Sequence, residues 1–237
     1  EEMVRATLRD DLNFDLNRLL DDMREWFNGS RFSPDGVEKM YNPQLVVSFL
    51  SDFTVSYEYP SGFVDVNVVS DFRKIANILS PLSLQYRESV IEDVLDDDSI
   101  TDGLTIQYNL EREFTTKDAV SLLYYNGLLS IEESFGDLMT YSIPNYVIKQ
   151  LYWEYFRADL EKEASFQFNS ASVGLALKEM SVEGKIDKLI SYTGEIIESL
   201  SFRDLQGFSE KHLKMIFMTV LAGNPLYFVS SEPETRT

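Results

Sequence analysis

Hydrophobic residues recur at helical spacing along most of the chain. Leucine, methionine and aromatic residues repeat every three to four positions between Leu12 and Phe27, which predicts an amphipathic helix. Asn28-Gly29 ends this helix, because both residue types tolerate the left-handed backbone of a C-terminal cap. A loop with a short hairpin follows, and Asn42 and Pro43 then predict the N-cap and first position of another helix. The same reasoning predicts helices within 1–8, 43–53, 69–79, 80–98, 115–125, 146–164, 171–200 with a break near Gly184, and 209–222.

Within residues 103–157 the pattern changes from helical to mixed. Residues 103–110 alternate and predict a strand, after which a helix capped by Thr115 or Thr116 ends at "NG". Two β-rich runs, "LLSIEE" and "LMTYSIP", are joined by "SFGD", and the helical run "YVIKQLYWEYF" follows them. Helix, two-stranded wing and helix in this order are typical of a winged-helix domain. The core of this unit is expected to combine the apolar face of the last helix with Leu122, Leu123, Leu128, Leu129 and Ile131.

Composition indicates a folded and acidic chain. Its 237 residues are 44% hydrophobic and 13% aromatic, which allows a substantial core and argues against disorder. The 40 Asp and Glu residues exceed the 21 Lys and Arg residues, and a net charge of −19 repels polyanions such as DNA. Cys is absent, which excludes disulfides and thiolate metal sites. No apolar run approaches the roughly 18 residues of a membrane span and no signal peptide is visible, so we expect no membrane partner and a cytoplasmic location.

The motifs of common catalytic and nucleotide sites are missing from the sequence. Neither G-x-x-x-x-G-K-[ST] nor G-x-G-x-x-G occurs, which argues against nucleotide sites of those kinds. His212 is the single histidine and no G-x-S-x-G motif accompanies it, so a structural role is favoured over a catalytic one. We therefore predict no catalytic, cofactor-binding or metal-ligating residue in these 237 residues.

Two other groups of residues have both a functional and a structural interpretation. The carboxylates of Asp96, Asp97 and Asp98 suit a hard cation, but they lack the Gly and Glu spacing of an EF-hand and read better as a solvated loop. A second group of aromatic residues suits base stacking, although helical spacing beside a hairpin favours burial in a core. These aromatic residues are Tyr124, Tyr125, Tyr152, Trp153, Tyr155 and Phe156.

Charge argues against DNA reading by the expected winged-helix unit. Its recognition helix carries Lys117 beside Asp118, and its wing carries Glu132, Glu133 and Asp137. A face that binds DNA requires an excess of basic residues, because contacts with the phosphates supply most of the affinity. The unit is therefore interpreted as a packing module, with nucleic-acid binding as the alternative. Acidic residues outnumber basic ones across it: Glu111, Glu113, Asp118, Glu132, Glu133, Asp137 and Glu154 against Arg112, Lys117, Lys149 and Arg157.

Five segments in a fixed order resemble one bacterial protein family. They are "DMREWFNGSRFS", "MYNPQLVVSFL", "VDVNVVSDFRKI", "SLLYYNGLLSI" and "YSIPNYVIKQLYWEYF". The chain resembles the predicted AAA-ATPase-like proteins that carry a PD-(D/E)XK nuclease-like domain at the C-terminus. Ser30, where the family usually has an aromatic residue, and Val147, near its P-N motif, depart from the pattern.

The resemblance implies a segment between two domains. Residues 1–162 would be a helical region that follows an absent ATPase core and includes a winged-helix unit at about 103–157. Residues 163–237 would be the helical lead-in and the first helix and strand of a truncated nuclease-like domain, where Glu210 and His212 loosely match an E-x-x-H-like region. ATP and Mg²⁺ are implied only for the full-length family.

From these observations we expect a mainly α (α+β) fold and a non-catalytic coupling function. The partners would be the ATPase and nuclease-like domains of the same parent polypeptide, since both ends of the chain look cut from something longer. The apolar run 226–229 near the C-terminus is expected to form an inner strand without a neighbour. An unpaired strand leaves backbone N–H and C=O groups without partners, so we expect the chain to self-associate through it.

Overall fold

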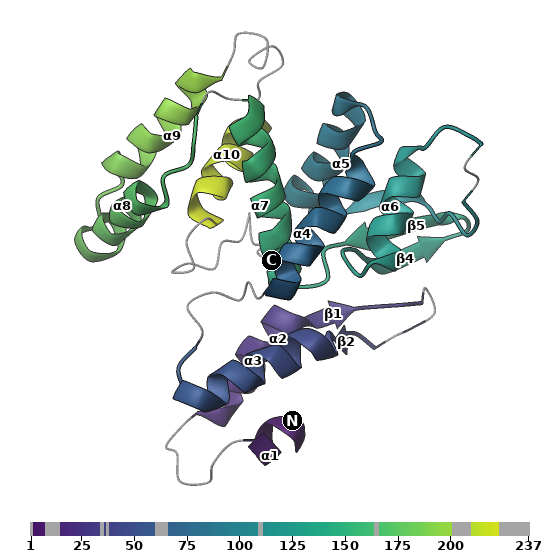
Figure 1. Cartoon of the computed structure of the whole chain (residues 1–237), viewed down its shortest axis with the longest axis horizontal. Helices are drawn as coiled ribbons and strands as arrows, with labels where there is room; N and C mark the ends of the chain where they lie inside the picture. The colour runs from purple at the N-terminus through teal and green to yellow at the C-terminus, as the bar shows by residue number, and fades with distance from the viewer. Residues whose placement is uncertain are drawn as a thin grey trace, which may run out of the picture. The chain divides into compact units, whose positions relative to one another are not determined.

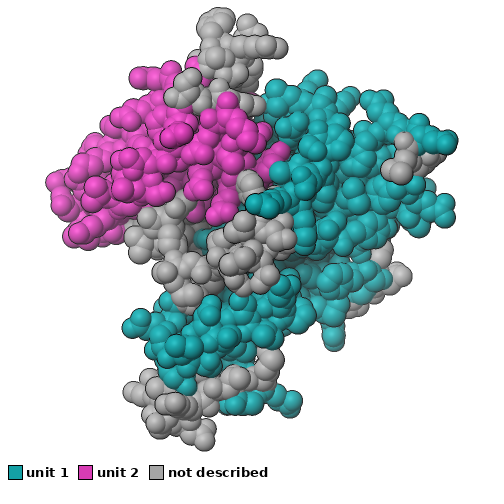
Figure 2. Space-filling model, in the orientation of Figure 1, with its two compact units in different colours: residues 1–151 teal, residues 152–237 magenta. Residues whose placement is uncertain are grey.

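A computed structural model gives a mainly helical protein with small antiparallel sheets (Figure 1). The chain forms two compact units, residues 1–151 and residues 152–237 (Figure 2). The division falls within the helix Tyr146–Glu163. The mainly helical class predicted from the sequence is confirmed. The structure describes residues 2–7, 15–33, 36, 38–59, 66–108, 111–163, 166–200 and 210–222.

The first unit begins with helices that enclose an aromatic core. Its first elements are α1 (Glu2–Thr7), α2 (Leu16–Phe27), β1 (Asn28–Ser30), β2 (Met40–Tyr41) and α3 (Pro43–Ser56). β1 and β2 form the expected short hairpin. The buried aromatic residues of α2 and α3 pack against one another: Trp26 meets Phe27 and Phe49 edge to face. Phe49 also stacks on Phe53 and meets Phe27 at a tilt.

Side-chain caps begin α2 and α3. Asp15 Oδ1 accepts hydrogen bonds from the N–H groups of Asn17 and Arg18 at 3.1 and 3.2 Å. Asn42 Oδ1 accepts from the first turn of α3 in the same way, and Pro43 occupies the first helical position as predicted. These local signals fix both helix starts without help from distant parts of the chain.

The end of α2 differs from the expectation. Asn28 is extended, with φ −90° and ψ 158°, because the chain passes directly into β1 instead of a left-handed cap. Gly29 follows with φ 131°, and a Cβ on Gly29 would lie only 1.6 Å from the carbonyl oxygen of Pro144. The glycine is therefore needed for close backbone approach, since any side chain would collide with Pro144.

The middle of the first unit is built from three helices and a three-stranded sheet. The helices are α4 (Val66–Leu79), α5 (Leu84–Asp96) and α6 (Thr116–Tyr125), and both α4 and α5 lie against α6. In Figure 1, α6 lies beside the hairpin that follows it in sequence. Four of the five predicted core residues are buried, namely Leu123, Leu128, Leu129 and Ile131, whereas Leu122 is half-buried.

The sheet consists of β3 (Ile100–Gly103), β4 (Ser130–Phe135) and β5 (Leu138–Ser142), in the antiparallel order β3-β5-β4. The prediction of a strand over 103–110 is wrong, because β3 ends where that run begins. The loop after Gly103 instead turns toward α6, where Thr105 donates hydrogen bonds to side chains of the helix. Residues 109–110 lie outside the described residues.

The second unit has a helical core. It contains the rest of α7 (Tyr146–Glu163), with α8 (Ser170–Glu183), α9 (Asp187–Ser199) and α10 (Glu210–Ala222). Gly184 ends α8 with φ 69°, which confirms the predicted break. The buried core is formed by Leu160, Val173, Ala176, Leu177, Leu189, Tyr192, Ile196, Leu200, Ile216 and Val220. The predicted strand at 226–229 and residue 209, the first of the predicted last helix, lie outside the described residues.

Candidate functional site

A buried carboxylate with several hydrogen-bond partners lies at the start of α6. Thr115 is the N-cap, and its N–H and Oγ1 donate to Asp118 Oδ2 at 3.0 and 2.8 Å. A carboxylate at the third helical position that reaches back to the N-cap is one half of a capping box. This spacing of Thr115 and Asp118 therefore positions the carboxylate before any tertiary contact is made.

Tertiary contacts complete the environment of Asp118. Arg112 donates from Nη1 to Oδ2 at 2.8 Å and from Nη2 to Oδ1, which makes a two-point ion pair. Thr105 Oγ1 donates to Oδ1 at 2.9 Å. Only 2% of the Asp118 surface is exposed. Burial alone would raise its pKa, but the hydrogen bonds from Arg112, Thr115 and Thr105 outweigh burial and lower the pKa to about 2.

Further hydrogen bonds fix the loop after β3 onto α6. Ser121 Oγ accepts from the N–H of Thr105 at 2.8 Å and donates to the carbonyl of Lys117 at 2.7 Å. Tyr125 donates from its hydroxyl to the carbonyl of Thr105 at 3.2 Å. Burial, followed by the neighbouring Tyr125, raises the pKa of Tyr108 to about 12, so this phenol stays protonated at neutral pH.

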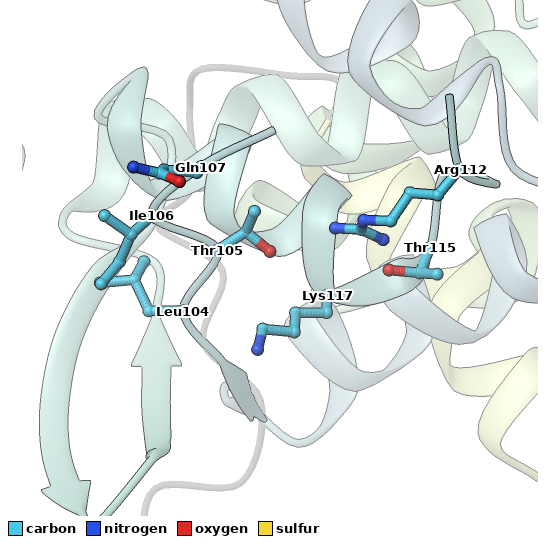
Figure 3. Close-up of a pocket in the computed structure, with 7 residues that line it drawn as sticks. All are labelled: Leu104, Thr105, Ile106, Gln107, Arg112, Thr115 and Lys117. Carbon is cyan, nitrogen blue, oxygen red and sulfur yellow. The ribbon is translucent and has the colours of Figure 1, made fainter. Parts of the chain in front are cut away.

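An open depression of about 520 Å³ adjoins this network (Figure 3). Figure 3 shows the Arg112 guanidinium directed toward Thr105 and Thr115, whereas the Lys117 ammonium points away from it. The end of the Lys117 side chain lies over Gly103, where an added Cβ would come within 2.9 Å of Cε and Nζ. The lining residues are Leu104, Thr105, Ile106, Gln107, Arg112, Thr115 and Lys117.

The chemistry available in the depression is limited. Asp118 is a weak base at neutral pH because its pKa is about 2, and Arg112 is already neutralised by it. The hydroxyls of Thr105 and Thr115 donate to the same carboxylate. Lys117 is the one lining cation that forms no ion pair with the described residues. The arrangement suits structural reinforcement better than acid–base or nucleophilic catalysis.

Most of the aromatic residues considered for base stacking are buried. Tyr124, Tyr152, Trp153 and Tyr155 are at most 7% exposed, whereas Tyr125 is 51% exposed. The core interpretation therefore holds for the four buried rings, since a buried ring cannot stack on a base.

The other candidates are dispersed. Asp97 and Asp98 are exposed, and Asp98 pairs with Lys149. Glu210 begins α10 and is exposed, while His212 in the same helix is half-buried. Within the described ranges no group of three or more His, Cys, Asp or Glu residues could hold a metal ion. Of the helices that the structure describes, none is long and apolar enough to span a membrane.

Sequence reasoning missed the Asp118 network, although part of it left a signal. Thr115 and Asp118 have capping-box spacing, which predicts the local bond between them. Arg112 lies six residues before Asp118 in an irregular segment, where no helical or strand periodicity predicts a contact. The contact of Thr105 with Asp118 depends on the path of the loop after β3, and the sequence pattern wrongly predicted a strand there.

Comparisons with known proteins assign no family. No protein-family model matches the chain, and no curated protein or solved structure matches it. The resemblance carried by the five ordered segments therefore stays a prediction. The function of the chain has to be inferred from its own residues and fold.

Proposed function

We propose that the chain is a non-catalytic structural segment that couples neighbouring domains of a larger polypeptide. In this proposal residues 103–157 form a winged-helix unit that serves for packing. The resemblance described above implies an ATPase core on one side and a nuclease-like domain on the other, and ATP and Mg²⁺ would bind to those domains.

The order of elements around α6 supports the winged-helix assignment. α5, β3, α6 and the β4–β5 hairpin follow one another, and the sheet order β3-β5-β4 brings the hairpin back beside the first strand. α6 immediately precedes the hairpin, as a recognition helix precedes its wing. The unit departs from the usual pattern between β3 and α6, where the described residues form no helix.

One observation favours a packing role for this unit over nucleic-acid recognition: the first turn of α6 makes its polar contacts within the protein. The buried carboxylate of Asp118 accepts hydrogen bonds from Arg112, Thr115 and Thr105 where a reading helix presents exposed polar or basic groups. Lys117 is the single basic residue of α6. Most of the helix is buried, namely Asp118, Ala119, Val120, Ser121, Leu123 and Tyr124.

The coupling role is tested by isolating the native polypeptide that contains this sequence and measuring its intact mass and tryptic peptides. The proposal requires a mass well above 27.3 kDa and peptides that extend beyond Glu1 and Thr237. A native product that consists of these 237 residues alone would exclude a coupling segment.

Nucleic-acid binding is the second candidate, and the position of Lys117 favours it. This cation lies on α6 at the rim of the depression and forms no ion pair with the described residues. A single lysine supplies one phosphate contact, whereas duplex binding usually draws on several. Duplex binding that is lost in Lys117→Glu would favour this candidate over packing.

A further inference from the structure

The tip of the β4–β5 hairpin exposes two large apolar side chains. Phe135 and Leu138 are register partners that flank the turn Gly136-Asp137, and Gly136 has φ 61°. Paired residues of an antiparallel ladder project to the same face, so their side chains form one surface. Phe135 is 87% exposed and Leu138 is 52% exposed. We call this pair the hairpin tip.

The rest of the hairpin anchors the tip in place. Ile131 and Tyr141, which pair across β4 and β5, are fully buried. Thr101 and Thr140 join β3 to β5 through a hydroxyl contact of 3.1 Å. The tip is thus presented by a fixed sheet, and Phe135 gains no cover from the hydrophobic core of its own unit.

Uncompensated acidic groups flank the hairpin tip. Glu133 and Asp137 are exposed and form no ion pair within the described ranges. Two bases beside the hairpin are engaged by its third acid, since Lys39 Nζ pairs with Glu132 Oε1 at 2.8 Å and Arg31 Nη1 donates to the Glu132 carbonyl at 2.7 Å. The end of the Lys117 side chain lies over Gly103, the register partner of Leu138 in β3, so one cation accompanies the two exposed acids. An apolar surface flanked by free carboxylates complements a partner with an apolar centre and basic flanks.

We propose that the hairpin tip is a docking surface for a basic, apolar segment of another polypeptide. Charge complementarity selects this occupant, because a second copy of the chain carries the same net charge of −19 and would be repelled. A nucleic acid would be repelled for the same reason. The inference is independent of the coupling role, since a free-standing chain would present the same hairpin.

The test uses two short labelled peptides with identical leucine and phenylalanine positions, one with lysine and one with glutamate at the remaining positions. Binding to the whole chain is measured by fluorescence anisotropy. Serine replaces both tip residues in the variant Phe135→Ser/Leu138→Ser. The matched control, Val55→Ser/Val182→Ser, removes two apolar side chains that are 85% and 75% exposed elsewhere. Each pair of substitutions leaves the net charge unchanged, so the comparison isolates the apolar contribution.

We expect the lysine peptide to bind, the glutamate peptide not to bind, and the tip variant to lose about tenfold in affinity, as for interface anchors. The control variant should bind like the wild type. Equal binding by wild type and tip variant would show that charge alone attracts the peptide and would overturn the proposal. Absence of lysine-peptide binding would overturn it too. So would sedimentation analysis that finds a dimer for the wild type and a monomer for the tip variant, because a second copy would then occupy the tip. Matching circular dichroism spectra establish that each variant is folded.

Discussion

At the scale of single residues, the buried ion pair of Asp118 and Arg112 has a structural role. Asp118 is almost fully buried, yet hydrogen bonds from Arg112, Thr115 and Thr105 keep its carboxylate ionised. Removing one member of such a group leaves the others without their partner in a region of low polarity, which costs more than the pair gains on formation. The network therefore sets how firmly α6 is joined to the loop after β3.

The substitution Asp118→Asn should destabilise the protein by about 2–3 kcal/mol. This is less than the roughly 3–5 kcal/mol typical of a fully buried pair, because the Arg112 side chain is 42% exposed. Urea unfolding measures the change in free energy and thermal unfolding the shift in melting temperature, with Asp137→Asn in the exposed hairpin turn as the control. Each kcal/mol corresponds to about 2–4 °C at this chain length, so a variant that melts within about 1 °C of the control would show that the network is unimportant.

The same carboxylate predicts an acid-dependent loss of stability. Its pKa is about 2 in the folded protein against an ordinary value of 3.8. Because the folded pKa is the lower one, the stabilisation is complete above the ordinary value and disappears as the pH falls toward 2. It amounts to about 2 kcal/mol at most. The difference in unfolding free energy between wild type and Asp118→Asn should shrink between about pH 4 and pH 2. A constant difference over that range contradicts the assignment.

Gly29 is expected to be intolerant of any side chain. In Gly29→Ala the new Cβ would meet the Pro144 carbonyl at 1.6 Å, and φ 131° is strained for alanine. We expect a loss of about 2 kcal/mol or more. Gly194→Ala is the control, because nothing lies within 4 Å of a Cβ there and the residue is inside α9. Alanine should stabilise that helix by roughly 0.5–1 kcal/mol. Equal stability of the two variants would refute the close approach at Gly29.

At the scale of elements, local signals were predictable and tertiary ones were not. Asn42 with Pro43 and the break at Gly184 were predicted because each acts on its own helix end. The strand at 103–110 was wrong because alternation alone did not show that Thr105 would bond to α6. In the candidate site, the Thr115–Asp118 contact had a sequence signal, whereas the contribution of Arg112 depends on the path of an irregular loop.

The inner face of α6 should be the most sensitive apolar surface of the first unit. Leu123 is fully buried, so Leu123→Ala removes packed methyl groups and should cost about 2–5 kcal/mol. The control is Leu175→Ala, since Leu175 is 64% exposed and should change stability by about 0.5 kcal/mol or less. Thermal unfolding followed by circular dichroism measures both. Similar midpoints for the two variants would mean that α6 is not packed as described.

At the scale of the whole molecule, charge opposes any role that needs contact with a polyanion. The net charge of −19 repels nucleic acid over distances of about 8–10 Å at ordinary ionic strength, and further at low salt. Apart from Lys117, the charged residues that would form a reading face are either engaged in the fold, as Asp118 is, or acidic, as Glu133 and Asp137 are. The partner proposed for the hairpin tip, a basic and apolar segment of another polypeptide, agrees with this charge.

The central claim is that the unit containing α6 packs and does not read nucleic acid. A labelled duplex titrated with the whole chain at low salt, where phosphate contacts are strongest, tests this claim most directly. Packing predicts no binding tighter than about 100 µM, and no difference among wild type, Lys117→Glu and the control Lys178→Glu in α8. Micromolar binding that disappears in Lys117→Glu and persists in Lys178→Glu would contradict it.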